Sequence, residues 1–260
     1  MGTSLLQLLM IPFLFFGIVA CVGLGRRLDA RRILEETERE RVVLTTVETS
    51  IYALLGLMIA FTFAGAAQRF DARRTLTIDE ANAIGDAYAR LDLLPAAAQP
   101  ALRADFRSYA LERLESFRAL PDVEASNRHA AGAGVLFARI WRGSVAAAGH
   151  EPSSASLLLL PRLNDMSSLA TTRAVLLQAK TPPLVLAVLV LMTLMCGVLV
   201  GNGFPGRTVP RLHQYGFALV LSLTLYVIVD LDHPRAGLIQ LDYADQAMVD
   251  ALAGMSAASN

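Results

Sequence analysis

The chain has 260 residues, of which 54% are hydrophobic, and it carries no formal net charge. Its mean hydropathy of +0.47 is higher than that of most soluble globular domains, so an integral membrane protein is expected. Nucleic acid is excluded as the expected partner, because recognition of that partner needs a basic surface. The two cysteines, Cys21 and Cys196, both lie in apolar runs and indicate neither a disulfide framework nor a metal site.

The first apolar run, at about residues 5–25, carries no charge and is long enough to cross a bilayer. No basic residue precedes it, so we expect it to be kept as a membrane helix and not removed as a signal peptide. A charged loop at 26–48 follows it. The i,i+4 spacing of its charges is compatible with part of a helical arm, and the alternative is a solvated linker.

The second apolar run, at about residues 50–67, continues without a proline into a charged amphipathic segment that ends before Pro95. Because proline is the residue that most reliably interrupts a helix, the sequence predicts one continuous helix over 50–94. About 45 residues at ~1.5 Å each span ~65 Å, roughly twice the hydrocarbon thickness of a bilayer. We therefore expect this helix to leave the membrane and enter water.

The remaining chain completes an all-α fold. Residues 71–182 show helical spacing of apolar residues without strand-like alternation, which predicts a helical extramembrane domain. Apolar runs at about 183–203 and 215–231 form a second transmembrane hairpin, and a tail covers 232–260. Together with the first hairpin, residues 1–70, this gives four transmembrane helices with the helical domain between helices 2 and 3.

The side of the membrane on which the helical domain lies stays open at this stage. Basic residues are concentrated in the short loops at 26–48 and 204–214, which favours placing the termini and the large domain outside. Other basic residues, including Arg69 and Lys180, lie close to the membrane on the opposite side and weaken this bias.

Catalysis has little support in the sequence. The histidines, His129, His150, His213 and His233, are scattered, and no metalloprotease, nucleophile-elbow, phosphate-loop or dinucleotide motif is present. We therefore expect no enzyme activity, no cofactor, no metal and no catalytic residue.

Three segments resemble a family of bacterial and plant membrane proteins described as bestrophin-like and of unknown function. They read FTFAGAAQRFDARRTLTIDEANAIGDAYARLDLLP, LNDMSSLATTR and LYVIVDLDHPRAGLIQLDYAD. The blocks DEANAIG, at 79–85, and DLDHPRAGLI, at 230–239, are specific, and the resemblance covers nearly the whole chain.

The resemblance implies a homo-oligomeric, chloride-type anion channel, a pentamer by analogy, in the bacterial inner (cytoplasmic) membrane. It also implies that the second membrane helix lines a narrow apolar neck and that the large domain is cytoplasmic. The chain lacks the compact acidic cluster with which animal bestrophins bind calcium. The alternative function is a non-conducting membrane scaffold or sensor whose helical domain binds a partner.

Within that hypothesis, Ile59 and Phe63 are the candidate neck residues, because i,i+4 spacing puts them on one face of the helix. Arg69 and Arg73, again at i,i+4, are the candidate residues that attract anions. The alternatives are that Ile59 and Phe63 face lipid or neighbouring helices, and that Arg69 snorkels to the membrane interface.

Two further features are candidates for structural roles. Asp230 ends an apolar helix, and we expect a charge latch with Arg235, with Arg69 or Arg73 as possible spatial partners; the alternative is a water-exposed cap. Gly197 and Gly201 have the GxxxG spacing that favours close packing of membrane helices.

Two acids and an amide, Asp79, Glu80 and Asn82, open the amphipathic part of the long helix. Adjacent helical positions point about 100° apart, so the two carboxylates cannot chelate one ion together. We expect these residues to form a solvated or intersubunit face.

Overall fold

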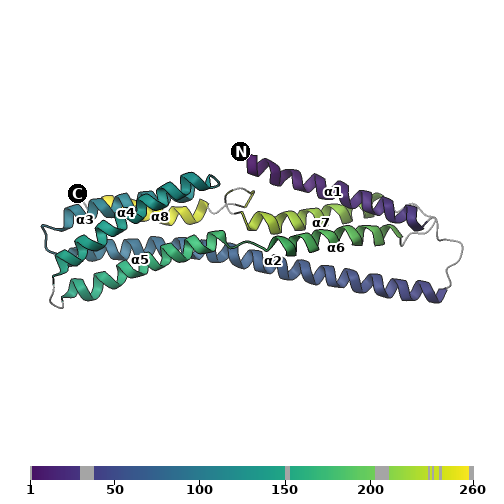
Figure 1. Cartoon of the computed structure of the whole chain (residues 1–260), viewed down its shortest axis with the longest axis horizontal. Helices are drawn as coiled ribbons and strands as arrows, with labels where there is room; N and C mark the ends of the chain where they lie inside the picture. Colours follow the sequence, from purple (N-terminus) through teal and green to yellow (C-terminus); the bar gives the residue numbers. More distant parts are fainter. Residues whose placement is uncertain are drawn as a thin grey trace. The chain divides into compact units, whose positions relative to one another are not determined.

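The computed structural model describes residues 2–29, 38–149, 153–202, 211–233, 235, 237–239 and 242–257. In this part of the chain all regular secondary structure is helical, which confirms the predicted all-α class. The described elements, shown in Figure 1, are α1 (Gly2–Asp29), α2 (Glu38–Ala89), the 3₁₀ helix η1 (Arg90–Leu93), α3 (Gln99–Arg118), α4 (Val123–Ala148), α5 (Ser154–Gln178), α6 (Pro183–Asn202), α7 (Arg211–Leu231) and α8 (Asp242–Ala257).

Four segments of the described chain are long and apolar enough to cross a membrane, as the sequence predicted. They lie within Leu9–Leu28, Val42–Leu93, Ser154–Asn202 and Arg211–Leu231. Each contains a stretch of at least the length that the hydrocarbon core requires. These four stretches indicate an integral membrane protein.

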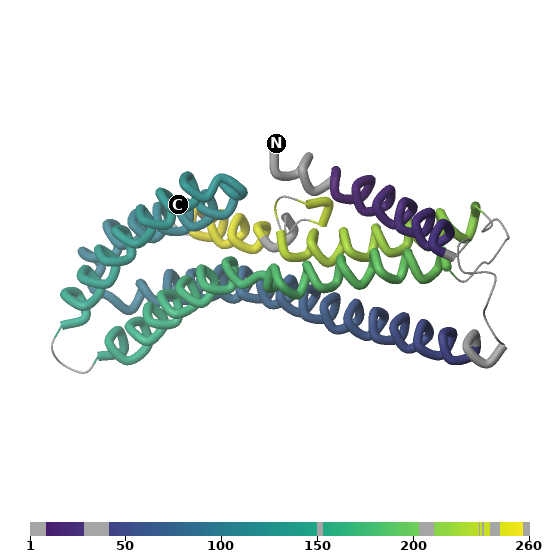
Figure 2. The backbone as a smooth tube through the Cα atoms, turned by 45° about the vertical axis from the view of Figure 1, so that its right-hand side comes forward, coloured from purple at the N-terminus to yellow at the C-terminus, as the bar shows by residue number. Residues whose placement is uncertain are grey.

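The second of these segments belongs to α2, which is one unbroken helix in both views (Figures 1 and 2). It begins at Glu38, earlier than the predicted start at residue 50, so the prediction of a loop at 26–48 needs correction. Residues 26–29 belong to α1 and 38–48 to α2, whereas 30–37 lie outside the described residues. No proline or glycine interrupts 38–48, which explains why the helix extends this far.

The chain forms two compact units. Unit 1 consists of Met1–Arg69 and Lys180–Leu238, and unit 2 consists of Phe70–Ala179 and Ile239–Asn260. Helix α2 contributes its first part to unit 1 and its last part to unit 2. The segment predicted as a single tail, 232–260, is divided between the units, because α8 belongs to unit 2.

In unit 1, α1 packs against α6 and α7, and glycines set the distance between α1 and α6. A Cβ atom at Gly25 would lie 1.9 Å from the carbonyl oxygen of Val198, and one at Gly201 would lie 2.1 Å from that of Val22. A Cβ at Gly197 would lie 3.2 Å from the Cβ of Cys21. The two backbones are therefore closer together than any residue with a side chain would allow.

In unit 2, five α-helices and η1 enclose one apolar core. Its largest fully buried apolar side chains are Ile84, Leu91, Phe106, Ile140, Leu159, Leu163, Met166 and Met248. Helix α8 is joined to this core by polar contacts as well, because the Tyr88 hydroxyl donates a 2.9 Å hydrogen bond to the carbonyl oxygen of Met255. The same oxygen accepts a 3.0 Å hydrogen bond from Nη2 of Arg107.

The contact between α1 and α6 predicts a position-specific cost of adding a methyl group. Gly201→Ala should lower the free energy of unfolding in detergent by about 1–3 kcal/mol, because the new Cβ forces the helices apart. Gly23→Ala on α1 is the matched control, since nothing lies within 4 Å of a Cβ there. Equal stabilities of the two variants would contradict the close approach.

Candidate functional site

The candidate neck residues lie in the apolar part of α2. Ile59 is half-buried, and Phe63, one turn further on, is 42% exposed. Their neighbours Leu57 and Phe61 are more exposed, at 52% and 72%. The chain itself therefore covers little of this part of α2, and the assignment of Ile59 and Phe63 to a neck stays a prediction.

Arg69 is engaged by an acidic partner within unit 1. Its Nε lies 3.0 Å from Oδ1 of Asp232, and its Nη2 lies 3.2 Å from Oδ2. Nη2 also donates to the hydroxyl oxygen of Thr181 at 2.5 Å, and the backbone N–H of Thr181 donates to Asp232 at 2.8 Å. This bidentate ion pair neutralises the positive charge of Arg69, which we expected to attract anions.

Asp230 is almost fully buried, and it organises the turn after α7. Its Oδ1 accepts a 3.0 Å hydrogen bond from the backbone N–H of Leu238. A Cβ at Gly237 would lie 1.8 Å from the same oxygen, so only glycine fits there. Arg235 lies in this turn and is half-buried. The Asp230–Arg235 latch stays a prediction. The acid that binds Arg69 is Asp232, and not Asp230, which the sequence suggested as a possible partner.

Arg73 is buried in unit 2, where it is 1% exposed. Its Nε and Nη2 donate to the carbonyl oxygens of Leu176 and Ala179, at 3.3 and 2.5 Å. These carbonyls belong to the C-terminal end of α5, where unpaired oxygens carry the negative end of the helix dipole. Arg73 therefore caps α5 and does not offer its charge to solvent.

Unit 2 also buries a group of three charges that contact one another, namely Glu80, Arg113 and Arg173. Nε of Arg113 lies 2.5 Å from Oε1 of Glu80, and Nη1 of Arg173 lies 2.7 Å from Oε2. Their side chains are 0%, 7% and 4% exposed, respectively. The expectation of a solvated or intersubunit face was therefore wrong for Glu80, which joins α2 to α3 and α5.

The ring of Phe117 lies against the two guanidiniums, and the Glu80 carboxylate raises the pKa of Arg113. The ring centroid of Phe117 lies 3.0 Å from Cζ of Arg173 and 5.5 Å from Cζ of Arg113, so both guanidiniums face its π-system. Burial lowers the pKa of Arg113, but the neighbouring Glu80 carboxylate outweighs burial and holds the pKa above its ordinary value. One Arg113 nitrogen, Nη2, is buried without a hydrogen-bond partner among the described residues.

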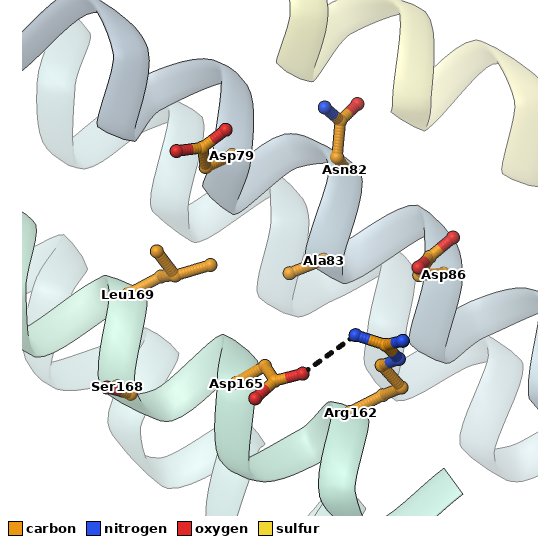
Figure 3. A pocket seen from close by; sticks show the side chains of 8 residues that line it. All are labelled: Asp79, Asn82, Ala83, Asp86, Arg162, Asp165, Ser168 and Leu169. Atoms are coloured by element: carbon orange, nitrogen blue, oxygen red, sulfur yellow. Dashed lines mark hydrogen bonds and ion pairs between the residues drawn. The ribbon is translucent and has the colours of Figure 1, made fainter. Parts of the chain in front are cut away.

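A cavity of about 380 Å³ lies between α2 and α5 in unit 2 (Figure 3). Its lining residues are Asp79, Asn82, Ala83 and Asp86 from α2, and Arg162, Asp165, Ser168 and Leu169 from α5. Arg162 reaches Oδ2 of Asp165 at 3.0 Å. The described part of the chain holds no group of three acidic, histidine or cysteine side chains that could bind a metal. The cavity is therefore acidic overall, because three carboxylates and one guanidinium line it.

Sequence reasoning missed Arg113 and Arg173, although a signal for both was present. Arg113 falls on the apolar stripe of α3 with Phe106 and Tyr109, and Arg173 falls on that of α5 with Met166. A charged residue on an apolar stripe is costly to bury unless it has an acidic partner. That pattern predicts a buried ion pair, but it does not say which acid supplies it.

The Glu80 network predicts that alanine substitutions at two adjacent residues lower the stability by very different amounts. Glu80→Ala should destabilise the protein by about 3–5 kcal/mol, because it leaves two buried guanidiniums without a counter-charge. Asp79→Ala, one position earlier and exposed, should change stability by less than about 0.5 kcal/mol. Thermal unfolding of the detergent-purified variants measures both. A Glu80 variant as stable as the Asp79 variant would show that the network does not hold unit 2 together.

Comparison with known proteins agrees with this fold. A family model described as a Bestrophin-like domain matches residues 13–245. No curated protein matches the sequence significantly. The zinc-phased crystal structure of a bacterial bestrophin homologue from Klebsiella pneumoniae is similar, with a TM-score of 0.65 and 14% identity over 95% of this chain and 98% of that one.

Two point mutants of the same Klebsiella pneumoniae homologue are similar at 14% identity. One has a TM-score of 0.66 and coverage of 95% and 99%, and the other has 0.67 with 96% and 98%. At this identity the structures show a shared fold, whereas the family model covers most of the sequence. The chain therefore belongs to the family of proteins with a Bestrophin-like domain.

Proposed function

We propose that this chain is the subunit of a homo-oligomeric ion channel in which α2 lines the conduction path. Membership in the bestrophin-like family supports the proposal, since the resemblance implies an anion channel of this architecture. In this proposal five copies surround the path, unit 2 stands outside the bilayer, and the membrane is the bacterial inner membrane. The observation that carries it is the poor burial of the apolar part of α2.

Only 11% of the apolar window of α2 is buried by the rest of the described chain, compared with 22–28% in the other three membrane-length segments. Gly56 has nothing within 4 Å of a Cβ, and Ala60 and Ala64 are exposed. Small side chains let membrane helices approach one another closely. This surface is therefore suited to packing against other copies of α2.

Of the two neck candidates, Phe63 is favoured, because it is exposed whereas Ile59 is half-buried. A ring of phenylalanine side chains around an axis narrows the path and makes it apolar. Such a constriction opposes the passage of hydrated ions, because water leaves a narrow apolar tube. Ile59, one turn away, extends the same apolar section of the path.

We expect Phe63→Ala to raise ion flux in proteoliposomes severalfold over the wild type, because it widens and wets the constriction. Phe61→Ala is the matched control, since Phe61 lies on the same helix, is 72% exposed and points to a different face. Unchanged flux in a folded, inserted Phe63 variant would remove Phe63 from the path. Absence of flux from every variant would favour the scaffold or sensor function.

A cation channel is the second candidate function, and the charges of α2 favour it. Arg69 and Arg73 are both engaged inside their own units, so neither offers a free positive charge. The exposed charged residues that follow on α2 are Asp71, Arg74, Asp79 and Asp86. If α2 borders the path, carboxylates outnumber guanidiniums along it, and carboxylate rings attract cations.

Reversal potentials distinguish the two candidates. Under a potassium chloride gradient, an anion channel reverses towards the chloride equilibrium potential and a cation channel towards that of potassium. Asp79→Asn with Asp86→Asn should move the reversal potential in the chloride direction if these residues border the path. Glu115→Gln on α3 is the control for a change of surface charge elsewhere. No shift in the double variant would exclude the two aspartates from the path.

A further inference from the structure

Each of the two ring nitrogens of His233 has a partner. Nδ1 lies 2.8 Å from the carbonyl oxygen of Val229, one turn earlier on α7. A carbonyl oxygen only accepts hydrogen bonds, so Nδ1 carries the proton and donates it. Nε2 lies 3.1 Å from Nζ of Lys180. An ammonium group only donates, so Nε2 must supply its lone pair, and His233 is therefore neutral when it binds Lys180.

This contact is one half of a two-part clasp, which we define as Lys180–Thr181 against Asp232–His233. In the other half, the backbone N–H of Thr181 donates to Oδ2 of Asp232 at 2.8 Å. The clasp joins the segment before α6 to the end of α7. Arg69 of α2 binds both Thr181 and Asp232, so α2 is attached to the same clasp.

From this geometry we propose that protonation of His233 opens the Lys180 half of the clasp and makes the protein respond to acidification. A protonated ring carries hydrogen on both nitrogens. Its Nε2–H would then face the three N–H groups of the Lys180 ammonium, and no acceptor would be left between two positive charges. Histidine is the side chain whose ordinary charge change falls between about pH 5 and 8.

The two acids that precede His233 have partners elsewhere. Asp232 directs its carboxylate to Arg69 and Thr181, and Asp230 directs Oδ1 to the N–H of Leu238. Arg235 lies in the turn after His233 and is half-buried. The pair is accessible to protons, because Lys180 is exposed and His233 is partly exposed.

The consequence for ion flow rests on the proposed function. If α2 lines the path, Arg69 attaches it to the Thr181–Asp232 half of the clasp. Loss of the adjacent Lys180 contact leaves that half alone to hold the segment before α6 against α7. Acidification should therefore change the flux through the attachment of α2 and not through the neck itself.

The contact can be tested without measuring flux, because Lys180 is the only lysine in the chain. Full-length protein in lipid nanodiscs is treated with an acetylating N-hydroxysuccinimide ester, and mass spectrometry follows the Lys180 peptide separately from the N-terminal amine. At pH 8 the His233→Ala variant should react up to about fivefold faster than the wild type, because its lysine lacks the acceptor. At pH 5.5 the two rates should be equal. Equal rates at pH 8 would overturn the proposal.

Flux measurements test the regulatory part. Wild-type flux should change between pH 7.5 and pH 5.5, whereas His233→Ala and Lys180→Met should show no such change. His213→Ala is the control and should keep the wild-type response, since His213 is exposed on α7 and lies outside the clasp. A wild-type response retained by His233→Ala would overturn regulation by this clasp. If no variant conducts, the proposed channel fails, and the labelling experiment alone decides the contact.

Discussion

The carboxylate of Glu80 is the single group on which the packing of unit 2 depends most. It is fully buried and binds two guanidiniums from different helices, α3 and α5. Each guanidinium would be expensive to bury alone, and the carboxylate would be as well. Because the three charges are stable only together, the ion pairs fix the relative register of α2, α3 and α5. Apolar side chains alone specify register less strictly, since they tolerate small shifts.

The same principle governs the arginines that precede Glu80 on α2. Arg69 is bound by Asp232 in unit 1, and Arg73 is bound by carbonyl oxygens of α5 in unit 2. Arginine suits both tasks, because its planar fork donates in several directions at once. Both of these positive charges are thus used for internal attachment. Between Asp71 and Asp86 the exposed charges of α2 are three carboxylates and one guanidinium, whereas the sequence suggested a surface that attracts anions.

Much of the fold could be predicted from the sequence, because hydropathy and helical spacing are local properties. The four membrane-length segments and the unbroken α2 follow from apolar run length and from the absence of proline before Pro95. The candidate site was harder to predict, since the partner of a charged residue can come from any part of the folded chain. Glu80 looked like a surface acid until α3 and α5 brought Arg113 and Arg173 to it. Asp232 likewise could not be preferred over Asp230 from spacing alone.

The position of α8 has a consequence for the order in which the protein is made. This helix is the last element of the described residues, and it supplies Met248 and Met255 to the core of unit 2. It also supplies the carbonyl oxygen of Met255, to which the Tyr88 hydroxyl donates a hydrogen bond. The last apolar segment, in α7, leaves the ribosome before α8 does. Unit 2 is therefore finished only after translation of all four membrane-length segments, although most of its residues are synthesised before the third.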